Sequence, residues 1–427
     1  MSVTQPITSS HLHRRAAIVP GRLALVSIAM ATAIGFAAWA STVEPPLQPR
    51  ADGVVLHDAA VATMAGFDAL QRARETGDPS QYAQAEVAFT RALREDPFDL
   101  DAIVGSGSLA LSRHQFAEAL KLGERALALD PGAARIYGVI GDAQVELGRY
   151  DAAVASVQRM VDLRPDLASY SRVSYLRELH GDLSGAIEAM SAAVSAGAGT
   201  AENTEYVRVQ LGNLYFATGD LDAAERTYQL SLAHLPDYHF ALAGLARVEA
   251  ARGNLDSAVD LYAKATARLP LPELVIGLGE ALEAAGRRDE AEDQYALVGA
   301  IQRLFSANGV RNDLELAAFF ADHGDADQAV TLALAGYAER PTIFAADMVA
   351  WALHRVGHSD EALPYVAEAL RLGTQNSRLL YHAGVIEAAA GQSELARQHL
   401  AQAIALNPAF SPLDAPRAAA ALQVLDR

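Results

Sequence analysis

The sequence predicts an all-α protein, a right-handed superhelical solenoid of about ten helix–turn–helix units with a C-terminal capping helix. Three regularities lead to this prediction. A glycine recurs at spacings of 33, 38, 34, 33, 38, 33 and 34 residues, an alanine follows each glycine five residues later, and Pro236 and Pro270 stand 34 residues apart. A period near this length is typical of stacked helix pairs. The glycines are Gly148, Gly181, Gly219, Gly253, Gly286, Gly324, Gly357 and Gly391, and the alanines are Ala153, Ala186, Ala224, Ala258, Ala291, Ala329, Ala362 and Ala396.

Each recurring residue type has a physical role in such a unit. Glycine accepts the left-handed conformation that ends one helix and lets the chain reverse. Alanine at the helix crossing lets two backbones approach closely, and proline ends the second helix because it cannot continue a helix interior. Asp182, Asp220 and Asp325 directly follow three of the glycines, where each can cap the next helix.

The N-terminal segment predicts export. Residues 1–22 are polar and carry three arginines, and residues 23–40 carry no charged side chain. In an export signal the basic start stays in the cytoplasm, so we expect the repeats outside it. Two fates stay open: Ala38 and Ala40 before Ser41 form a small-residue cleavage site, whereas the 18-residue apolar run is just long enough for a transmembrane anchor. A proline-rich linker, residues 41–57, follows.

The predicted solenoid occupies residues 58–410. Its first unit has a loop at residues 76–80 in place of a simple turn, and its second unit has His114 where the turn glycine would stand. The two 38-residue spacings predict insertions at residues 196–203 and 301–311. We expect the second insertion to lengthen a helix.

The last segment, residues 411–427, is a short alanine-rich stretch after Pro408. Pro416 suits the first turn of a helix, where its missing N–H is not needed. Because a solenoid requires a cap over its last open face, we expect a capping helix here.

The unit at residues 205–236 has the clearest pattern. Its marked positions are, in order, Leu211, Gly212, Tyr215, Gly219, Ala224, Tyr228, Ser231 and Pro236. This pattern resembles the tetratricopeptide repeat nearly position by position, and the resemblance extends over roughly residues 60–410. It implies an array that binds a protein or peptide without catalysis. The stretches at residues 362–365 and 407–413 further resemble exported bacterial tetratricopeptide proteins of unassigned role.

The composition excludes several kinds of partner and site. The net charge is −18, from 34 basic and 52 acidic residues, so the main body is poorly suited to nucleic acids or anionic membranes. The absence of cysteine excludes disulfides, thiolate metal sites and cysteine nucleophiles. The sequence also lacks a glycine-rich phosphate loop, a zinc-protease motif and a nucleophile elbow. We therefore expect no enzymatic activity, no cofactor and no metal site.

The resemblance also implies where a partner binds. In tetratricopeptide arrays the first helices of the units line a concave groove, and aromatic and polar side chains there suit an extended or helical peptide. The corresponding positions in this chain are Arg135, Asp142, Tyr175, Tyr206, Asn213, Phe216, Phe240, Arg247, Phe344, Asp347, Trp351, Arg378 and Tyr381.

These observations favour a monomeric, non-catalytic scaffold outside the cytoplasmic membrane, either exported or anchored, that binds a protein or peptide in its groove. Two alternatives remain. One is an accessory subunit of an envelope machine for transport or polysaccharide assembly. The other is a solute or cation binder that uses an acidic groove.

Overall fold

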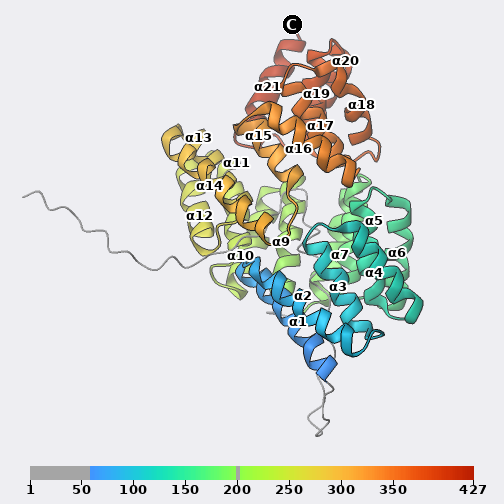
Figure 1. The fold of residues 1–427 in the computed structure, drawn as a ribbon. Coiled ribbons are helices and arrows are strands. Elements are labelled where there is room, and N and C mark those ends of the chain that lie inside the picture. The colour runs from blue at the N-terminus through green and yellow to red at the C-terminus, as the bar shows by residue number, and fades with distance from the viewer. Residues whose placement is uncertain (1–57, 199–201) are drawn as a thin grey trace, which may run out of the picture.

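The computed structural model describes residues 58–198 and 202–427, and within these ranges the fold is the predicted all-α solenoid, with helices and no strand (Figure 1). Ten antiparallel helix pairs, units 1 to 10, follow one another, and a single helix, α21, closes the C-terminal end. The predicted export segment and linker lie outside the described residues. In the described part, no helix is long and apolar enough to cross a bilayer.

The first helices of most neighbouring units pack against each other and form an inner layer, and the second helices lie outside them. The inner helices are α1 (Asp58–Thr76), α3 (Leu100–Ser112), α5 (Ala134–Glu146), α7 (Leu167–Leu179), α9 (Glu202–Ala217), α11 (His239–Ala251), α13 (Pro272–Ala284), α15 (Asp313–His323), α17 (Ile343–Arg355) and α19 (Ser377–Ala389). The outer helices are α2 (Ser80–Glu95), α4 (Phe116–Leu129), α6 (Tyr150–Leu163), α8 (Leu183–Ala196), α10 (Leu221–His234), α12 (Leu255–Arg268), α14 (Arg288–Ala307), α16 (Ala326–Glu339), α18 (Ser359–Ala369) and α20 (Ser393–Leu406). The capping helix α21 is Asp414–Leu425.

The turns have mostly the predicted chemistry. Seven of the eight recurring glycines have φ between +68° and +86°, and His114 takes the same left-handed conformation at φ +58°. Asp182, Asp220 and Asp325 each accept hydrogen bonds from backbone N–H groups of the following helix, as predicted. The exception is Gly324, which has φ −150°, so the chain leaves α15 in a more extended conformation than predicted.

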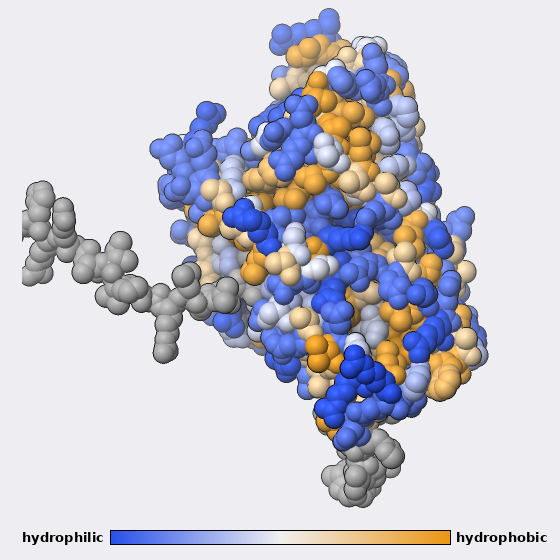
Figure 2. Space-filling view, viewed as in Figure 1, coloured by the Kyte–Doolittle hydropathy of each residue, from blue (hydrophilic) through white to orange (hydrophobic). Residues whose placement is uncertain are grey.

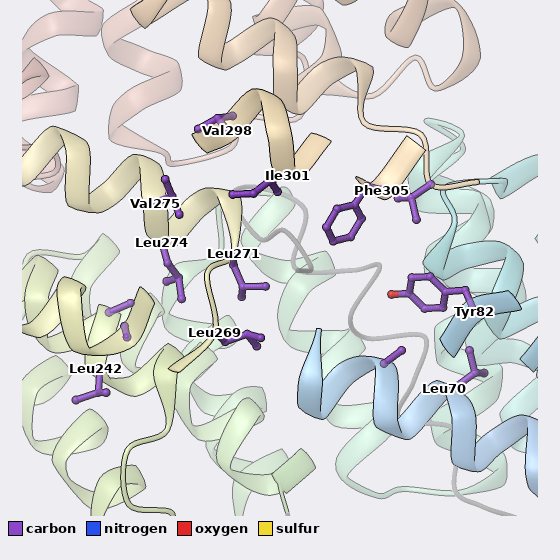
Figure 3. Close-up of a cluster of buried hydrophobic side chains, with 14 of the residues drawn as sticks. Leu70, Tyr82, Leu242, Leu269, Leu271, Leu274, Val275, Val298, Ile301 and Phe305 are labelled. Carbon is purple, nitrogen blue, oxygen red and sulfur yellow. The ribbon is translucent and has the colours of Figure 1, made fainter. Parts of the chain in front are cut away.

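The second insertion lengthens α14, as predicted, and gives that helix a further contact. Its last turns carry Ile301 and Phe305, which belong to the same buried apolar cluster as Leu70 of α1 and Tyr82 of α2. Figure 3 shows these side chains converging from helices far apart in the sequence, with Leu271 beside them. The insertion therefore joins units 1 and 7.

Contacts between unit 1 and units 6 and 7 are the first of a series. The turn of unit 2 contacts the end of unit 7, and the turns of units 3, 4 and 5 contact the ends of units 8, 9 and 10. Each contact joins a unit to the unit five further along, so the superhelix completes a turn and stacks on itself. In Figure 1 the orange and red C-terminal helices lie above the teal helices of the early units. We call this series of contacts the seam. It joins four pairs of segments, namely residues 113–114 with 309–315, 146–150 with 340–343, 179–181 with 373–375, and 216–219 with 406–408.

Hydrogen bonds cross the seam at each step. The Ile343 backbone N–H donates to the Tyr150 hydroxyl at 3.0 Å, and the Asn407 side-chain amide donates to the Phe216 carbonyl at 2.7 Å. Between them, the Thr374 hydroxyl donates to the Leu179 carbonyl. These bonds hold the two sides of the seam together.

The outer surface agrees with the acidic composition. Hydrophilic side chains predominate on the face drawn in Figure 2, and hydrophobic ones gather over the C-terminal helices at the top of the view. Partly buried apolar side chains that pack on the core of units 8 to 10 include Val330, Leu332 and Leu422.

Candidate functional site

The predicted partner contacts all lie on inner helices, but only some remain accessible. Seven of the thirteen side chains are partly exposed, and they are distributed from α5 to α19. These seven are Arg135, Tyr175, Asn213, Phe240, Arg247, Phe344 and Arg378. The other six are buried, namely Asp142, Tyr206, Phe216, Asp347, Trp351 and Tyr381.

Asp142 shows why a polar side chain of the inner layer can be inaccessible to a partner. Its carboxylate accepts two hydrogen bonds from Arg172, at 2.8 Å from Nε and 2.6 Å from Nη2. Both side chains are almost fully buried, with 1% and 3% exposed. A buried, bidentate pair of this kind is a costly arrangement to break, so Asp142 holds α5 to α7.

Trp351 is the centre of a second packed group. Its ring stacks on the His382 imidazole with 4.1 Å between centroids, and its Nε1 donates to the Asp322 carboxylate at 2.8 Å. On the other side of His382, the Asp347 carboxylate lies 3.0 Å from the imidazole Nδ1. These contacts join α15, α17 and α19, and they give Trp351 and Asp347 a packing role.

The structure brings three of the predicted residues together between units 5 and 6. The Arg247 guanidinium lies over the Phe216 ring, 5.2 Å from its centroid, and donates to the Asn213 side-chain oxygen. The Tyr228 hydroxyl donates to the same oxygen at 2.7 Å. Because Asn213 and Arg247 remain partly exposed, a guanidinium and an amide are available here for recognition of a peptide.

Arg378 lies in an acidic part of the inner layer. Burial alone would lower the pKa of its guanidinium, but the carboxylates of Glu280, Asp414, Asp322 and Asp347 outweigh this effect and raise the pKa. Carboxylates therefore outnumber the cation at this end of the array. This arrangement suits a partner that brings basic groups.

Sequence reasoning missed a buried charged group at the seam. Arg340 donates to Glu315 at 2.7 Å, and its other nitrogen lies 3.5 Å from Glu146. The His114 imidazole contacts the Arg311 carbonyl and lies 3.9 Å from Glu315. The available signals were His114 in a turn position and an inserted segment five units later, and neither indicates that the two meet.

Burial controls the ionisation of this group. Burial lowers the pKa of His114 to about 4, although nearby Glu315 opposes the change. Burial also raises the pKa of Glu146 to about 7, against the effect of Arg340. For Glu315 burial would raise the pKa, but the charge of Arg340 prevails and lowers it. The seam is therefore held by an Arg340–Glu315 ion pair next to a neutral imidazole.

Replacing His114 by asparagine should make the protein less sensitive to acid. The folded pKa of about 4 lies below the unfolded value of 6.5, so the unfolded state takes up the proton first and stability is lost as the pH falls between these values. A shift of this size in a side chain that is 7% exposed corresponds to roughly 3 kcal/mol. Urea denaturation from neutral to acid pH measures the difference between variant and wild type.

Asparagine is the suitable replacement because it tolerates a left-handed backbone. Glu146 contributes a pH dependence of the opposite sign, but it is present in both proteins and largely cancels. Parallel stability curves for the two proteins would contradict a buried neutral imidazole at the seam.

The described residues offer no other chemistry. Within residues 58–198 and 202–427 there is no group of three or more His, Asp or Glu side chains placed to hold a metal ion. The glycines of the Gly277–Gly279 stretch approach the Tyr262 and Tyr295 rings inside the helix pairs, which is a packing role. The seven partly exposed inner-layer residues are therefore the candidate site.

Comparison with known proteins gives the following similarities. Three models described as tetratricopeptide repeat match residues 110–177, residues 70–134, 209–271 and 349–409, and residues 272–296. Cellulose synthase 1 operon protein C of Komagataeibacter xylinus is 29% identical over 207 residues, which are 48% of this chain and 13% of that protein. Cellulose synthase operon protein C of Xanthomonas axonopodis pv. citri (strain 306) is 32% identical over 198 residues, 46% of this chain and 11% of that protein.

The chain thus matches only a small part of these relatives. Among solved structures, the human IFIT1 dimer with PPP-AAAA aligns at a TM-score of 0.44 and 13% identity, covering 90% of this chain and 96% of that chain. The Cut9–Hcn1 hetero-tetramer of the APC/C aligns at 0.41 and 16% identity, covering 90% and 79%.

Proposed function

The chain belongs to the tetratricopeptide repeat family, and from this premise we propose that it is a non-catalytic scaffold of a bacterial envelope machine that assembles a polysaccharide. The observation that carries the proposal is its similarity to two proteins named for cellulose synthase operons. Both similarities span nearly half of this chain. The family's fold is generally non-catalytic and generally binds proteins or peptides.

The proposed partner is a protein subunit of that machine, and the proposed site is the partly exposed part of the inner layer. The Asn213–Arg247 group and Arg378 provide polar contacts, and Phe240 and Phe344 provide partly exposed aromatic rings. Because the array is a large preformed surface, little ordering cost falls on the scaffold when a partner binds.

The proposed location is outside the cytoplasmic membrane, because residues 1–40 have the order of an export signal. Retention of residues 23–40 as an anchor would keep the scaffold beside a membrane-bound synthase. Cleavage after Ala40 would release it.

Photo-crosslinking in the native envelope tests the proposal. A photoreactive residue in place of Phe344 should crosslink to a subunit of a polysaccharide synthase, and deletion of the gene should lower polysaccharide output. The same probe at Leu334, which is 42% exposed on the outer helix α16, is the matched control. Crosslinks to the synthase from Leu334 but not from Phe344 would contradict the inner site, and unchanged polysaccharide output would contradict the function.

Charge reversal tests the polar group separately. Arg247→Glu should weaken binding of the crosslinked subunit by about tenfold or more, because it removes the partly exposed guanidinium donor from the site. Arg226→Glu makes the same charge change on the exposed side of α10 and should leave binding unchanged. Equal affinities for the two variants, measured with helical content intact by circular dichroism, would remove Arg247 from the site.

A further inference from the structure

The N-terminal end of the solenoid presents an uncovered apolar face. It belongs to α1 and α2, and Val61 and Val87 on it are 47% and 70% exposed. In most later units the matching side packs against the unit before it. This face holds an open pocket of about 490 Å³ lined by Val61, Ala62, Ala65, Ala83, Gln84, Val87, Ala88 and Arg91.

We propose that residues 52–57 of the same chain cover this pocket, with Val54, Val55 and Leu56 lying over Val61 and Val87. These three apolar residues directly precede α1, which begins at Asp58. Leu56 then occupies the position before the N-cap residue, and Val61 is the fourth residue of the helix. This is the spacing at which two apolar side chains pack against each other and fix the entry of the chain into a helix.

The geometry of the two helices brings the pocket within reach. Arg91 of α2 lies 3.8 Å from Asp58, so the end of α2 is beside the start of α1. Packed helices lie roughly 8–10 Å apart, and three extended residues span roughly 10 Å. Val54–Leu56 can therefore cross from α1 to α2.

Charge complementarity favours the same occupant. The Arg91 side chain at the rim of the pocket is 61% exposed, and Asp52 is two residues before the apolar triplet. With this segment in place the solenoid is capped at both ends by its own chain, because α21 covers the other end. The inner layer is then the surface left for a partner.

A thiol-protection experiment tests the proposal, because the chain has no cysteine of its own. In the purified full-length chain, the thiol of Val87→Cys should be alkylated about tenfold or more slowly than that of Val154→Cys, which corresponds to about 1.4 kcal/mol in favour of the covered state. Val154 is the control because it is also an exposed valine on an outer helix, at 43% against 70% for Val87. Adding Val55→Ser and Leu56→Ser should abolish the protection, with helical content unchanged.

A second variant gives a positive signal for the contact. Leu56→Cys together with Val87→Cys should form an intramolecular disulfide under mild oxidation, whereas Leu56→Cys with Val154→Cys should not. Rapid alkylation of Val87→Cys would overturn the proposal. Protection that persists in the serine variant, or that disappears on dilution, would assign the face to another segment or to a second copy of the chain, and would also overturn it.

Discussion

Replacing Gly181 by alanine should destabilise the protein far more than replacing Gly286, although the two backbones are nearly identical, with φ +78° and +77°. Both variants place a Cβ in the left-handed region, at a cost of about 1–2 kcal/mol. At Gly286 nothing lies within 4 Å of the added atom, but at Gly181 it would come within 3.0 Å of the Gly373 carbonyl oxygen across the seam. We expect a further loss of about 1–3 kcal/mol for Gly181→Ala, from the overpacking.

Urea denaturation followed by far-UV circular dichroism measures both losses. Gly391→Ala is a second control, because Gly391 has φ +79° and also has open space around it. If the seam exists in solution, Gly181→Ala loses more stability than either control variant. Equal losses in the three variants would mean that units 4 and 9 do not touch.

The seam changes how an array of this kind is expected to unfold. In an ordinary solenoid each unit contacts only its neighbours, and stability is close to a sum of local terms. Here unit 3 contacts the end of unit 8 through Glu146 and Arg340, so opening one unit also affects a unit five places away. We therefore expect the unfolding transition to be more cooperative than in an array whose units contact only their neighbours.

Most of the fold could be predicted from the sequence because its determinants are local. A turn glycine followed by aspartate specifies a helix end and a helix start within a few residues, as at Gly219 and Asp220. The lengthened α14 could be predicted because its extra residues continue the helix to a stop at Ser306–Gly309. Gly324 was the wrong prediction, since its position in the period gave no sign that α15 ends in a more extended conformation.

The candidate site could be predicted only in part. Sequence position correctly places Asn213 and Arg247 on inner helices with partly exposed side chains. It does not reveal that Arg172 closes over Asp142, or that His382 stacks on Trp351, because those contacts depend on how adjacent units are rotated. The seam is still harder to predict from the sequence, because it depends on the small rotation between neighbouring units, summed over five units.

Arg340→Met should be the most damaging substitution at the seam, at about 3–5 kcal/mol, because it leaves two buried carboxylates without their cation. Glu315 and Glu146 lie 2.7 and 3.5 Å from the guanidinium, and their side chains are 3% and 7% exposed. Without Arg340 the pKa of Glu315 in the folded state should rise above its unfolded value, and the pKa of Glu146, which is already about 7, should rise further. Stability is then lost as the pH rises, so the deficit measured by urea denaturation should be larger at alkaline than at mildly acid pH.

Two further variants separate a seam effect from the loss of any arginine. Arg287→Met removes the partner of Glu290 from an exposed pair at 2.6 Å, and should change the stability little because solvent screens this pair. Arg340→Met combined with Glu315→Gln and Glu146→Gln should recover much of the lost stability and lose its excess pH dependence, because no buried charge is left unpaired. If the combined variant is as unstable as Arg340→Met alone, the loss comes from packing of the arginine stem against Phe116 and its neighbours. The charges would then contribute specificity to the seam rather than stability.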